Sequence, residues 1–358
     1  MRVLVWQWGR RGAGPRVAVE LAQGLGAVPG VAALLSLSSG AEILRGPNPP
    51  RCDLVVRTYG TAAGFAARLA TLPLTVPYLA RRVRRLAPDV AVCAMPAPLD
   101  LAMAAALRRA GVPFLAVVHD ADAHPGDGLP FQMPLQRALL RRAGGLVALS
   151  AHVAARLREQ GAVGARPLLH ASLPPLAFGP APPALAHGGP LRLLSFGRLL
   201  PYKGLDLLAA ALAQVGPRPD LVVRVVGSGP DSAALARLRA LPGVSVENRW
   251  VPEAELGELI AWSDALVLSH REASQSGVAA AAVAARRWVV ATRVGGLAEQ
   301  LAREPLAILC EPTEPGITDG LRRLLATARE PPRDADPGAP WREAVARLAD
   351  GLQALVRA

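Results

Sequence analysis

Residues 195–206 read Ser-Phe-Gly-Arg-Leu-Leu-Pro-Tyr-Lys-Gly-Leu-Asp, and this stretch indicates the fold of the chain around it. The apolar residues 191–196 lead into a loop bracketed by two glycines, and residues 204–215 continue with the apolar spacing of a helix. A short apolar strand, a loop and a helix form the repeating unit of parallel sheets. The stretch therefore predicts a strand, a loop at its carboxyl end and a helix.

The same alternation runs outward from this stretch through both halves of the chain. Each half predicts one α/β domain with a parallel sheet, because short apolar runs alternate with longer segments rich in Ala, Leu and Arg. The predicted strands are residues 3–6, 53–57, 90–94, 114–118, 146–149, 191–196, 221–226, 265–268 and 288–291, and the predicted helices are residues 15–25, 62–70, 99–110, 204–215 and 231–241.

The length of 358 residues favours two domains over one. Residues 167–190 are rich in Pro, Ala, Gly and His without periodicity, which predicts a linker. We therefore expect an N-terminal domain over residues 1–180 and a C-terminal domain over residues 190–335. Beyond a proline-rich stretch, residues 340–358 have helical spacing and are expected to form a separate helix that can pack back on the N-terminal domain.

The loops that follow strands carry the candidate chemistry, because ligands of open parallel sheets bind beyond the carboxyl ends of the strands. In the first such loop, Gly197 and Gly204 permit close backbone approach, and Arg198 and Lys203 place two cations at the start of a helix. This arrangement suits a diphosphate. The alternative is that both cations are solvated surface charges.

A second loop, residues 269–278, reads Ser-His-Arg-Glu-Ala-Ser-Gln-Ser-Gly-Val after an apolar strand. Small residues around Gly277 are expected to expose backbone N–H groups at a helix N-terminus, and Glu272 can accept hydrogen bonds from sugar hydroxyls. The loop therefore suits a phosphate and a sugar together. The alternative makes Ser274 or Ser276 a helix cap and Glu272 a surface acid.

Together with residues 290–299, these loops resemble the C-terminal half of glycosyltransferase family 4, which comprises retaining enzymes of the GT-B fold. The resemblance implies two Rossmann-like parallel-sheet domains that face each other across a cleft, and it assigns Arg198 and Lys203 to the diphosphate of a nucleotide-sugar donor. Residues 247–252 resemble the segment that borders the nucleotide base; the alternative is an ordinary strand end with a core Trp250. The donor-binding residues implied are Gly12, Gly197, Arg198, Lys203, Arg249, Trp250, Glu272, Ser274, Gln275, Ser276 and Gly277.

The resemblance extends more weakly over the N-terminal domain. Residues 8–14 resemble the family's glycine loop beside the donor sugar and acceptor, although they lack a complete GxGxxG fingerprint. His119, at the end of a predicted strand, corresponds to a His that lines the sugar pocket; a structural His is the alternative. The implied catalytic set is His119, Glu272, Arg198 and Lys203.

Two further features concern residues near this set. His124, His152 and His170 are interpreted as surface or loop residues, although residues 124–127 can belong to an active-site loop. The family usually carries a second glutamate eight positions after the first, and Ala280 stands there instead. The way in which ribose is held is therefore open.

Composition narrows the other function classes. The formal net charge of +12 suits phosphate-bearing ligands or anionic membranes, and a GC-rich genome would also account for the abundant Arg. We expect no nucleic-acid partner, because no helix-turn-helix, RNP or zinc spacing is present. Three scattered Cys and no paired acids after a strand predict no metal and no cofactor.

Without a signal-peptide pattern or a long apolar run, the chain is expected to be cytoplasmic. The basic residues 81–85 beside Leu79 and Leu86 predict peripheral contact with an anionic membrane.

The predicted function is therefore sugar transfer, with retention and without a metal, from a nucleotide-diphosphate sugar to a lipid-linked glycan, a polysaccharide or a small molecule. Rival enzymes with the same fold are a nucleotide-sugar epimerase and a glycogen-type phosphorylase. A rival from another class is a catalytically silent nucleotide-sugar binding protein, which the Ala280 replacement makes conceivable.

Overall fold

The computed structural model describes residues 1–46, 48–124, 126, 131–327, 336 and 338–357. The chain divides into two compact units, and each is described by itself. Unit 1 comprises Met1–Ala123, Gly128–Pro174 and Ala339–Ala358, and unit 2 comprises His124–Asp127 and Pro175–Gly338. Both units contain a parallel β-sheet, which confirms the predicted pair of α/β domains.

Unit 1 has a seven-stranded sheet in the order β3-β2-β1-β4-β5-β6-β7. Its central strands are wholly buried, as expected of a sheet covered by helices on both faces. The strands are β1 Arg2–Gln7, β2 Ala32–Ser38, β3 Leu54–Val56, β4 Val90–Cys93, β5 Phe114–Val118, β6 Gly145–Ala148 and β7 Leu168–His170; the helices are α1 Ala13–Gly26, η1 Glu42–Arg45, α2 Ala62–Ala70, α3 Leu72–Leu86, α4 Asp100–Ala110, α5 Gln132–Leu140, α6 Ala151–Glu159 and α13 Ala339–Arg357.

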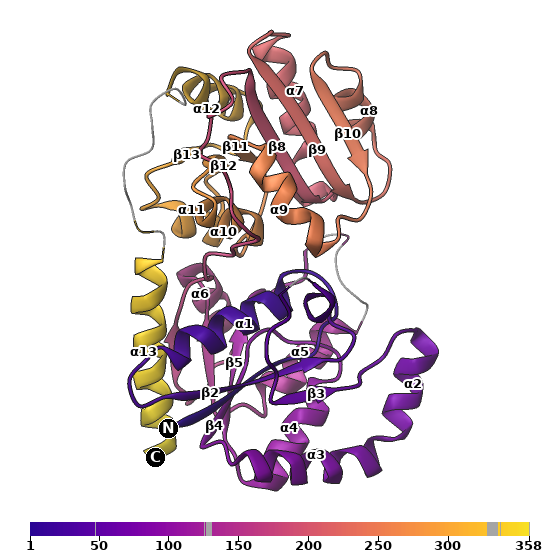
Figure 1. The fold of residues 1–358 in the computed structure, drawn as a ribbon, viewed down its shortest axis with the longest axis vertical. Coiled ribbons are helices and arrows are strands. Elements are labelled where there is room, and N and C mark those ends of the chain that lie inside the picture. The colour runs from indigo at the N-terminus through magenta and orange to yellow at the C-terminus, as the bar shows by residue number, and fades with distance from the viewer. Residues whose placement is uncertain (47, 125, 127–130, 328–335, 337, 358) are drawn as a thin grey trace. The chain divides into compact units, whose positions relative to one another are not determined.

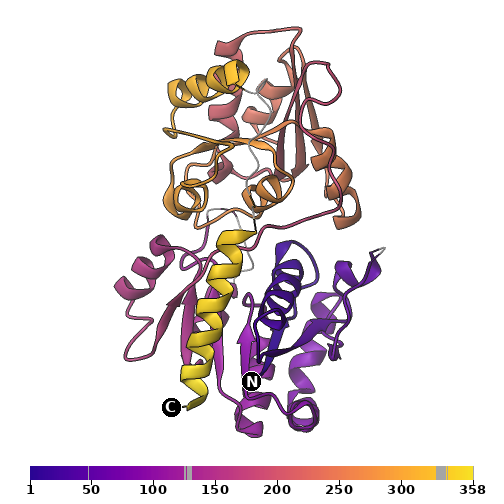
Figure 2. The ribbon, with the colours of Figure 1, turned by 60° about the vertical axis from the view of Figure 1, so that its left-hand side comes forward.

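The helix α13 belongs to unit 1 although it follows unit 2 in the sequence (Figures 1 and 2). It packs along α1 and β7, where two glycines allow close approach. A Cβ atom at Gly351 would lie 2.4 Å from Leu169, and one at Gly24 would lie 3.1 Å from Val345. The tight fit buries the apolar face of α13 against unit 1.

Unit 2 has a six-stranded sheet in the order β10-β9-β8-β11-β12-β13. Apolar residues of β8 and its neighbours form cores on both faces of this sheet. The strands are β8 Leu191–Arg198, β9 Leu221–Ser228, β10 Val244–Asn248, β11 Ala265–Leu268, β12 Trp288–Thr292 and β13 Ala307–Cys310; the helices are η2 Pro201–Lys203, α7 Leu205–Val215, α8 Ala233–Arg239, α9 Glu253–Trp262, α10 Gly277–Ala284, α11 Gly295–Leu301 and α12 Glu314–Thr327.

The nine predicted strands all occur, with ends shifted by up to two residues. The strands β2, β7, β10 and β13 were not predicted. The final residues of β2, Ser36-Leu37-Ser38, are all buried. Ser36 accepts a hydrogen bond from the Trp8 indole, and Ser38 shares one with Thr58. Because these polar partners are distant in sequence, the burial of Ser36 and Ser38 does not follow from the local pattern.

Candidate active site

The candidate site of unit 2 lies where the strand order reverses. From β8 the chain builds β9 and β10 on one side of the sheet, and then returns to place β11, β12 and β13 on the other side. The carboxyl ends of β8 and β11 are therefore neighbours at a topological switch point, the usual ligand position in open α/β sheets. The two loops predicted to carry the chemistry follow these two strands.

The loop between β8 and α7 is built around Tyr202, whose side chain is buried. The Lys203 Nζ atom lies 5.1 Å from the centre of the Tyr202 ring, and the Arg198 guanidinium lies 5.9 Å from it. Cations at these distances are attracted by the face of an aromatic ring. The ring therefore holds close together the two cations, Arg198 and Lys203, that are predicted to bind the diphosphate.

Lys203 also contacts His270, which was not among the predicted site residues. Its Nζ atom donates to Nε2 of His270 over 2.7 Å. Burial lowers the pKa of His270 well below its ordinary value, and the nearby Lys203 ammonium lowers it further. His270 is therefore neutral and accepts a hydrogen bond, which orients Lys203 without cancelling its charge.

Backbone contacts join the two loops across the switch point. The Ser269 hydroxyl donates to the Lys203 carbonyl over 2.8 Å, and the Arg271 N–H donates to the Tyr202 carbonyl over 2.8 Å. Gly204 has a φ of 63° and comes so close to the second loop that a Cβ atom at this position would lie 2.0 Å from the carbonyl oxygen of Ser269. The chain path around Lys203 is thus fixed by the loop that follows β11.

Glu272 extends from the second loop with half of its side chain exposed. Its Oε1 atom lies 3.3 Å from Nδ1 of His124, and the His124 ring stacks on Tyr202 at a centroid distance of 4.8 Å. His124 lies in a loop, as predicted, but it is not a surface residue, because only 14% of its side chain is exposed. Pro125 and Asp127 of the predicted active-site loop lie outside the described residues.

The N-terminus of α10 offers fewer N–H groups than the sequence suggested. The Ser276 hydroxyl accepts from the Ala279 N–H, and the Ser276 N–H itself donates to Oε1 of Gln300. Ser276 is thus the helix cap that the alternative reading foresaw, while Ser274 and Gln275 are buried beside it. Both amide atoms of Gln275 are buried and make no hydrogen bond within the described chain, which is unusual for buried polar atoms.

Arg249 and Trp250 follow β10, which β9 separates from β8. The Arg249 guanidinium pairs with Glu247 at 3.1 Å and with Glu255 at 2.8 Å. Its charge is therefore already balanced, whereas the Trp250 side chain is partly exposed. Ala280 is buried, and its carbonyl accepts a hydrogen bond from the Leu176 N–H.

Two predicted site residues belong to unit 1 instead. Gly12 caps α1 with a φ of 78°, a conformation that favours glycine, after the loop that follows β1. His119 follows β5, and its Nδ1 atom lies 2.9 Å from the Asp120 carboxylate. Both occupy the carboxyl edge of their sheet. Within the described residues, no three His, Cys, Asp or Glu side chains are grouped to hold a metal ion.

Comparisons with known proteins cover both units. Residues 14–168 match the family model described as Glycosyltransferase Family 4, and residues 190–327 match the model described as Glycosyl transferases group 1. The chain belongs to glycosyltransferase family 4. This family 4 glycosyltransferase is thus an enzyme of sugar transfer. No curated protein matches its sequence significantly.

Solved structures similar to this glycosyltransferase share its two-unit architecture. Sucrose-phosphate synthase from Thermosynechococcus elongatus aligns with a TM-score of 0.64 and 18% identity over 99% of this chain and 98% of that one. HepE from Anabaena, in complex with UDP and glucose, aligns with a TM-score of 0.66 and 18% identity over 100% of this chain and 97% of that one. A putative UDP-N-acetylglucosamine 2-epimerase from Listeria monocytogenes aligns with a TM-score of 0.59 and 12% identity over 97% of this chain and 94% of that one. The glycosyltransferase therefore has the expected GT-B fold of two Rossmann-like domains.

Proposed function

We propose that the enzyme moves a sugar, with retention of configuration and without a metal ion, from a nucleotide-diphosphate sugar to an acceptor. The observation that carries the proposal is the pairing of Arg198 and Lys203 around Tyr202 at the switch point of unit 2. Two cations held in place suit the two charges of a diphosphate. The complex of HepE with UDP and glucose adds support from a protein of the same fold.

In this proposal, Arg198 and Lys203 stabilise the negative charge that develops on the diphosphate as the anomeric bond breaks. Preorganised charges of this kind contribute several kcal/mol to transition-state stabilisation. Glu272, held by His124, accepts hydrogen bonds from sugar hydroxyls, and Gln275 supplies a further polar contact. His119 and Gly12 belong to the sugar and acceptor side. Because Ala280 is buried and lacks a carboxylate, ribose is held by other groups.

One experiment separates transfer from silent binding. Purified protein is incubated with radiolabelled UDP-sugars and GDP-sugars, with and without crude lipid and glycan acceptors. A labelled product that needs an acceptor supports transfer, whereas conversion of the donor sugar alone indicates an epimerase. Nucleotide binding without any product would support the silent binding protein.

The single lysine of the chain allows a direct test of the donor site. Lys203 is the only lysine among 40 basic Lys and Arg residues, so an amine-reactive label reaches only Lys203 and the N-terminal amine. Nucleoside diphosphates that bind at Arg198 and Lys203 are expected to protect Lys203, but not the N-terminal amine, from the label. Mass spectrometry of the labelled peptides measures both. Equal labelling with and without a nucleotide that stabilises the protein would place the nucleotide elsewhere.

We expect EDTA to leave sugar transfer unchanged, because Arg198 and Lys203 already supply the positive charge that a divalent ion would provide. Initial rates are compared with and without EDTA, and then with added Mg²⁺ or Mn²⁺. Loss of activity that either metal restores would contradict a metal-independent mechanism.

The proposed location is cytoplasmic, with peripheral contact to an anionic membrane through α3. Leu79 and Leu86 do not form the apolar part of this surface as predicted, because Leu79 is buried and Leu86 packs against the core of unit 1. Leu74 and Tyr78 are exposed instead, by 78% and 58%, and they share a helix face with Arg81. None of the described helices is both long and apolar enough to span a bilayer.

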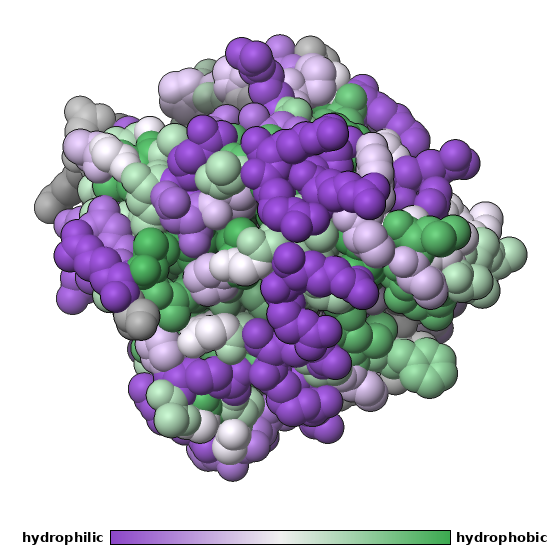
Figure 3. Space-filling view, turned by 90° about the horizontal axis from the view of Figure 1, so that it is seen from below, coloured by the Kyte–Doolittle hydropathy of each residue, from purple (hydrophilic) through white to green (hydrophobic). Residues whose placement is uncertain are grey.

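Figure 3 views the molecule from below Figure 1, towards the α3 end of unit 1, and shows hydrophobic patches beside crowded hydrophilic side chains. We expect wild-type protein to float with anionic vesicles at low salt and to detach at high salt, because each basic residue near such a surface contributes about 1 kcal/mol. The test variant changes Arg81, Arg82, Arg84 and Arg85 to Gln, and the control changes the exposed Arg108, Arg109, Arg141 and Arg158 to Gln.

Flotation of the control but not of the test variant supports the α3 surface. Equal flotation of wild type and the test variant, or no flotation of either, would contradict it and favour a soluble acceptor. Neutral vesicles measure the apolar contribution alone.

A further inference from the structure

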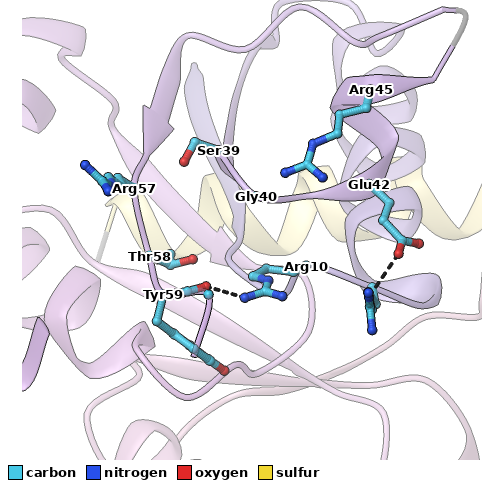
Figure 4. Close-up of a pocket in the computed structure, with 10 residues that line it drawn as sticks. Arg10, Ser39, Gly40, Glu42, Arg45, Arg57, Thr58 and Tyr59 are labelled. Atoms are coloured by element: carbon cyan, nitrogen blue, oxygen red, sulfur yellow. Dashed lines mark hydrogen bonds and ion pairs between the residues drawn. The ribbon is translucent and has the colours of Figure 1, made fainter. Parts of the chain in front are cut away.

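A cavity lies in unit 1, at the carboxyl ends of β1, β2 and β3, and the proposed mechanism does not use it. It has a volume of about 340 Å³ (Figure 4). This volume lies at the lower end of the range for small-molecule sites. Its walls are Arg10 and Arg11 after β1, Ser39 and Gly40 after β2, Glu42 and Arg45 of η1, and Arg57, Thr58, Tyr59 and Gly60 after β3.

The charges around this cavity are unbalanced. Its lining contains four arginines and one acid, Glu42. Glu42 forms an ion pair with Arg11 at 3.0 Å. Arg10 donates to the Tyr59 carbonyl over 2.6 Å, a neutral acceptor that leaves its charge uncompensated. Arg45 and Arg57 have no ion pair within the described chain.

The arginines are presented by a fixed backbone. The Glu42 N–H donates to the Arg10 carbonyl over 2.9 Å, which ties η1 to the loop after β1, and the Ser39 N–H donates to the Val56 carbonyl over 2.9 Å. Gly40 forms the floor, where a Cβ atom would lie 3.2 Å from Cδ of Arg10. In Figure 4, Arg45 and Arg57 stand on opposite sides of Ser39 and Gly40. The Arg45 guanidinium points towards Gly40, whereas the Arg57 guanidinium extends away from it, so an anion above Gly40 would meet Arg10 and Arg45, with the Arg57 charge at the edge of the cavity.

We propose that this cavity binds a phosphate group carried by the sugar acceptor. A phosphate has two negative charges and several terminal oxygens, so it can meet more than one guanidinium fork at once. A carboxylate has one charge and two oxygens, and a single arginine satisfies it. The uncompensated guanidiniums of Arg10 and Arg45, with the further positive charge of Arg57 at the edge of the cavity, therefore match a phosphate better. That the phosphate belongs to a sugar acceptor rests on the proposed function, whereas phosphate binding by the cavity does not.

The test titrates inorganic phosphate and glycerol 3-phosphate into the full chain by calorimetry. Arg45→Gln combined with Arg57→Gln is expected to weaken glycerol 3-phosphate binding at least about tenfold, because the charge-assisted hydrogen bond from Arg45 and the positive charge of Arg57 are both lost. Arg108→Gln combined with Arg109→Gln removes the same charge from exposed positions of unit 1 and is expected to bind like wild type. The single variants serve if the double variant does not fold.

Several outcomes would overturn the assignment. Wild-type affinity in the Arg45/Arg57 variant would show that the cavity does not bind phosphate. Weakening in Lys203→Gln instead would place the phosphate in unit 2. Glycerate that binds as tightly as glycerol 3-phosphate would favour a carboxylate ligand.

Two further measurements identify the source of the phosphate and separate the two proposals. The vesicle test uses proteins in which Arg81, Arg82, Arg84 and Arg85 are changed to Gln, so that α3 does not contribute. Flotation with phosphatidic acid vesicles that the added Arg45/Arg57 changes abolish indicates a lipid phosphate, whereas binding of glycerol 3-phosphate without flotation indicates a soluble acceptor. UDP binding is expected to be unchanged in the Arg45/Arg57 variant. If glycerol 3-phosphate binds in the cavity but no sugar is transferred, the proposed function fails and the phosphate site stands. If transfer occurs and the variant binds phosphate normally, only the cavity proposal fails.

Discussion

Lys203→Ala and Arg198→Ala are each expected to lower turnover at least about tenfold while the fold stays intact, since each removes a cation from the departing diphosphate. The loss should appear mainly in kcat if the charge acts on the transition state, and mainly in KM if it acts on donor binding alone. Arg218→Ala is the matched control, because Arg218 is an exposed cation of unit 2 that precedes β9, at the opposite edge of the sheet. Unchanged kinetics in both variants would refute the diphosphate assignment.

Lys203→Arg sharpens this test. The Lys203 ammonium lies 2.7 Å from Nε2 of the buried His270, and a guanidinium is larger and planar. We expect the Arg variant to lose most of the activity although the charge is kept. Full activity in Lys203→Arg would show that the contact with His270 has no role in positioning the cation.

Gly204→Ala is the second substitution from which we expect a large effect. A Cβ atom at this position would lie 2.0 Å from the carbonyl oxygen of Ser269, so one of the two loops must move. We expect a loss of at least about 3 kcal/mol in unfolding free energy, from the positive φ and the clash together, and a marked loss of donor binding. Thermal unfolding and donor KM measure the two effects.

Gly111→Ala separates the two causes of that loss. Gly111 ends α4 in the same left-handed conformation as Gly204, with a φ of 74°, but a Cβ atom there meets nothing within 4 Å. It therefore carries only the cost of the left-handed conformation, about 1 kcal/mol. If Gly204→Ala is no more destabilising than Gly111→Ala, the close contact between the loops is not important.

The sequence predicted those parts of the site that are local in the chain. The strand, loop and helix around Arg198 and Lys203 follow from one stretch of residues, and so does the loop that carries Glu272. The strand order does not follow from periodicity, because it depends on which side of β8 each new strand joins. The adjacency of the two loops was therefore available only through the family resemblance.

Contacts between distant residues account for what the sequence missed. His124 reaches Glu272 across 148 positions, and no local pattern distinguishes it from other loop histidines. The Ser276 N–H was expected to be available to a ligand, but the distant Gln300 occupies it. One further sequence signal is that the single Lys of this Arg-rich chain stands at position 203, within the candidate diphosphate loop.

The division of unit 1 between separated parts of the chain sets an order of events during synthesis. A ribosome that has made residues 1–174 has produced every strand of the unit 1 sheet, but not the helix α13 that covers α1 and β7. Translation of residues 175–338 comes next and takes on the order of ten seconds. During that interval the nascent unit 1 presents an uncovered apolar groove, which makes it a target for chaperones until α13 emerges.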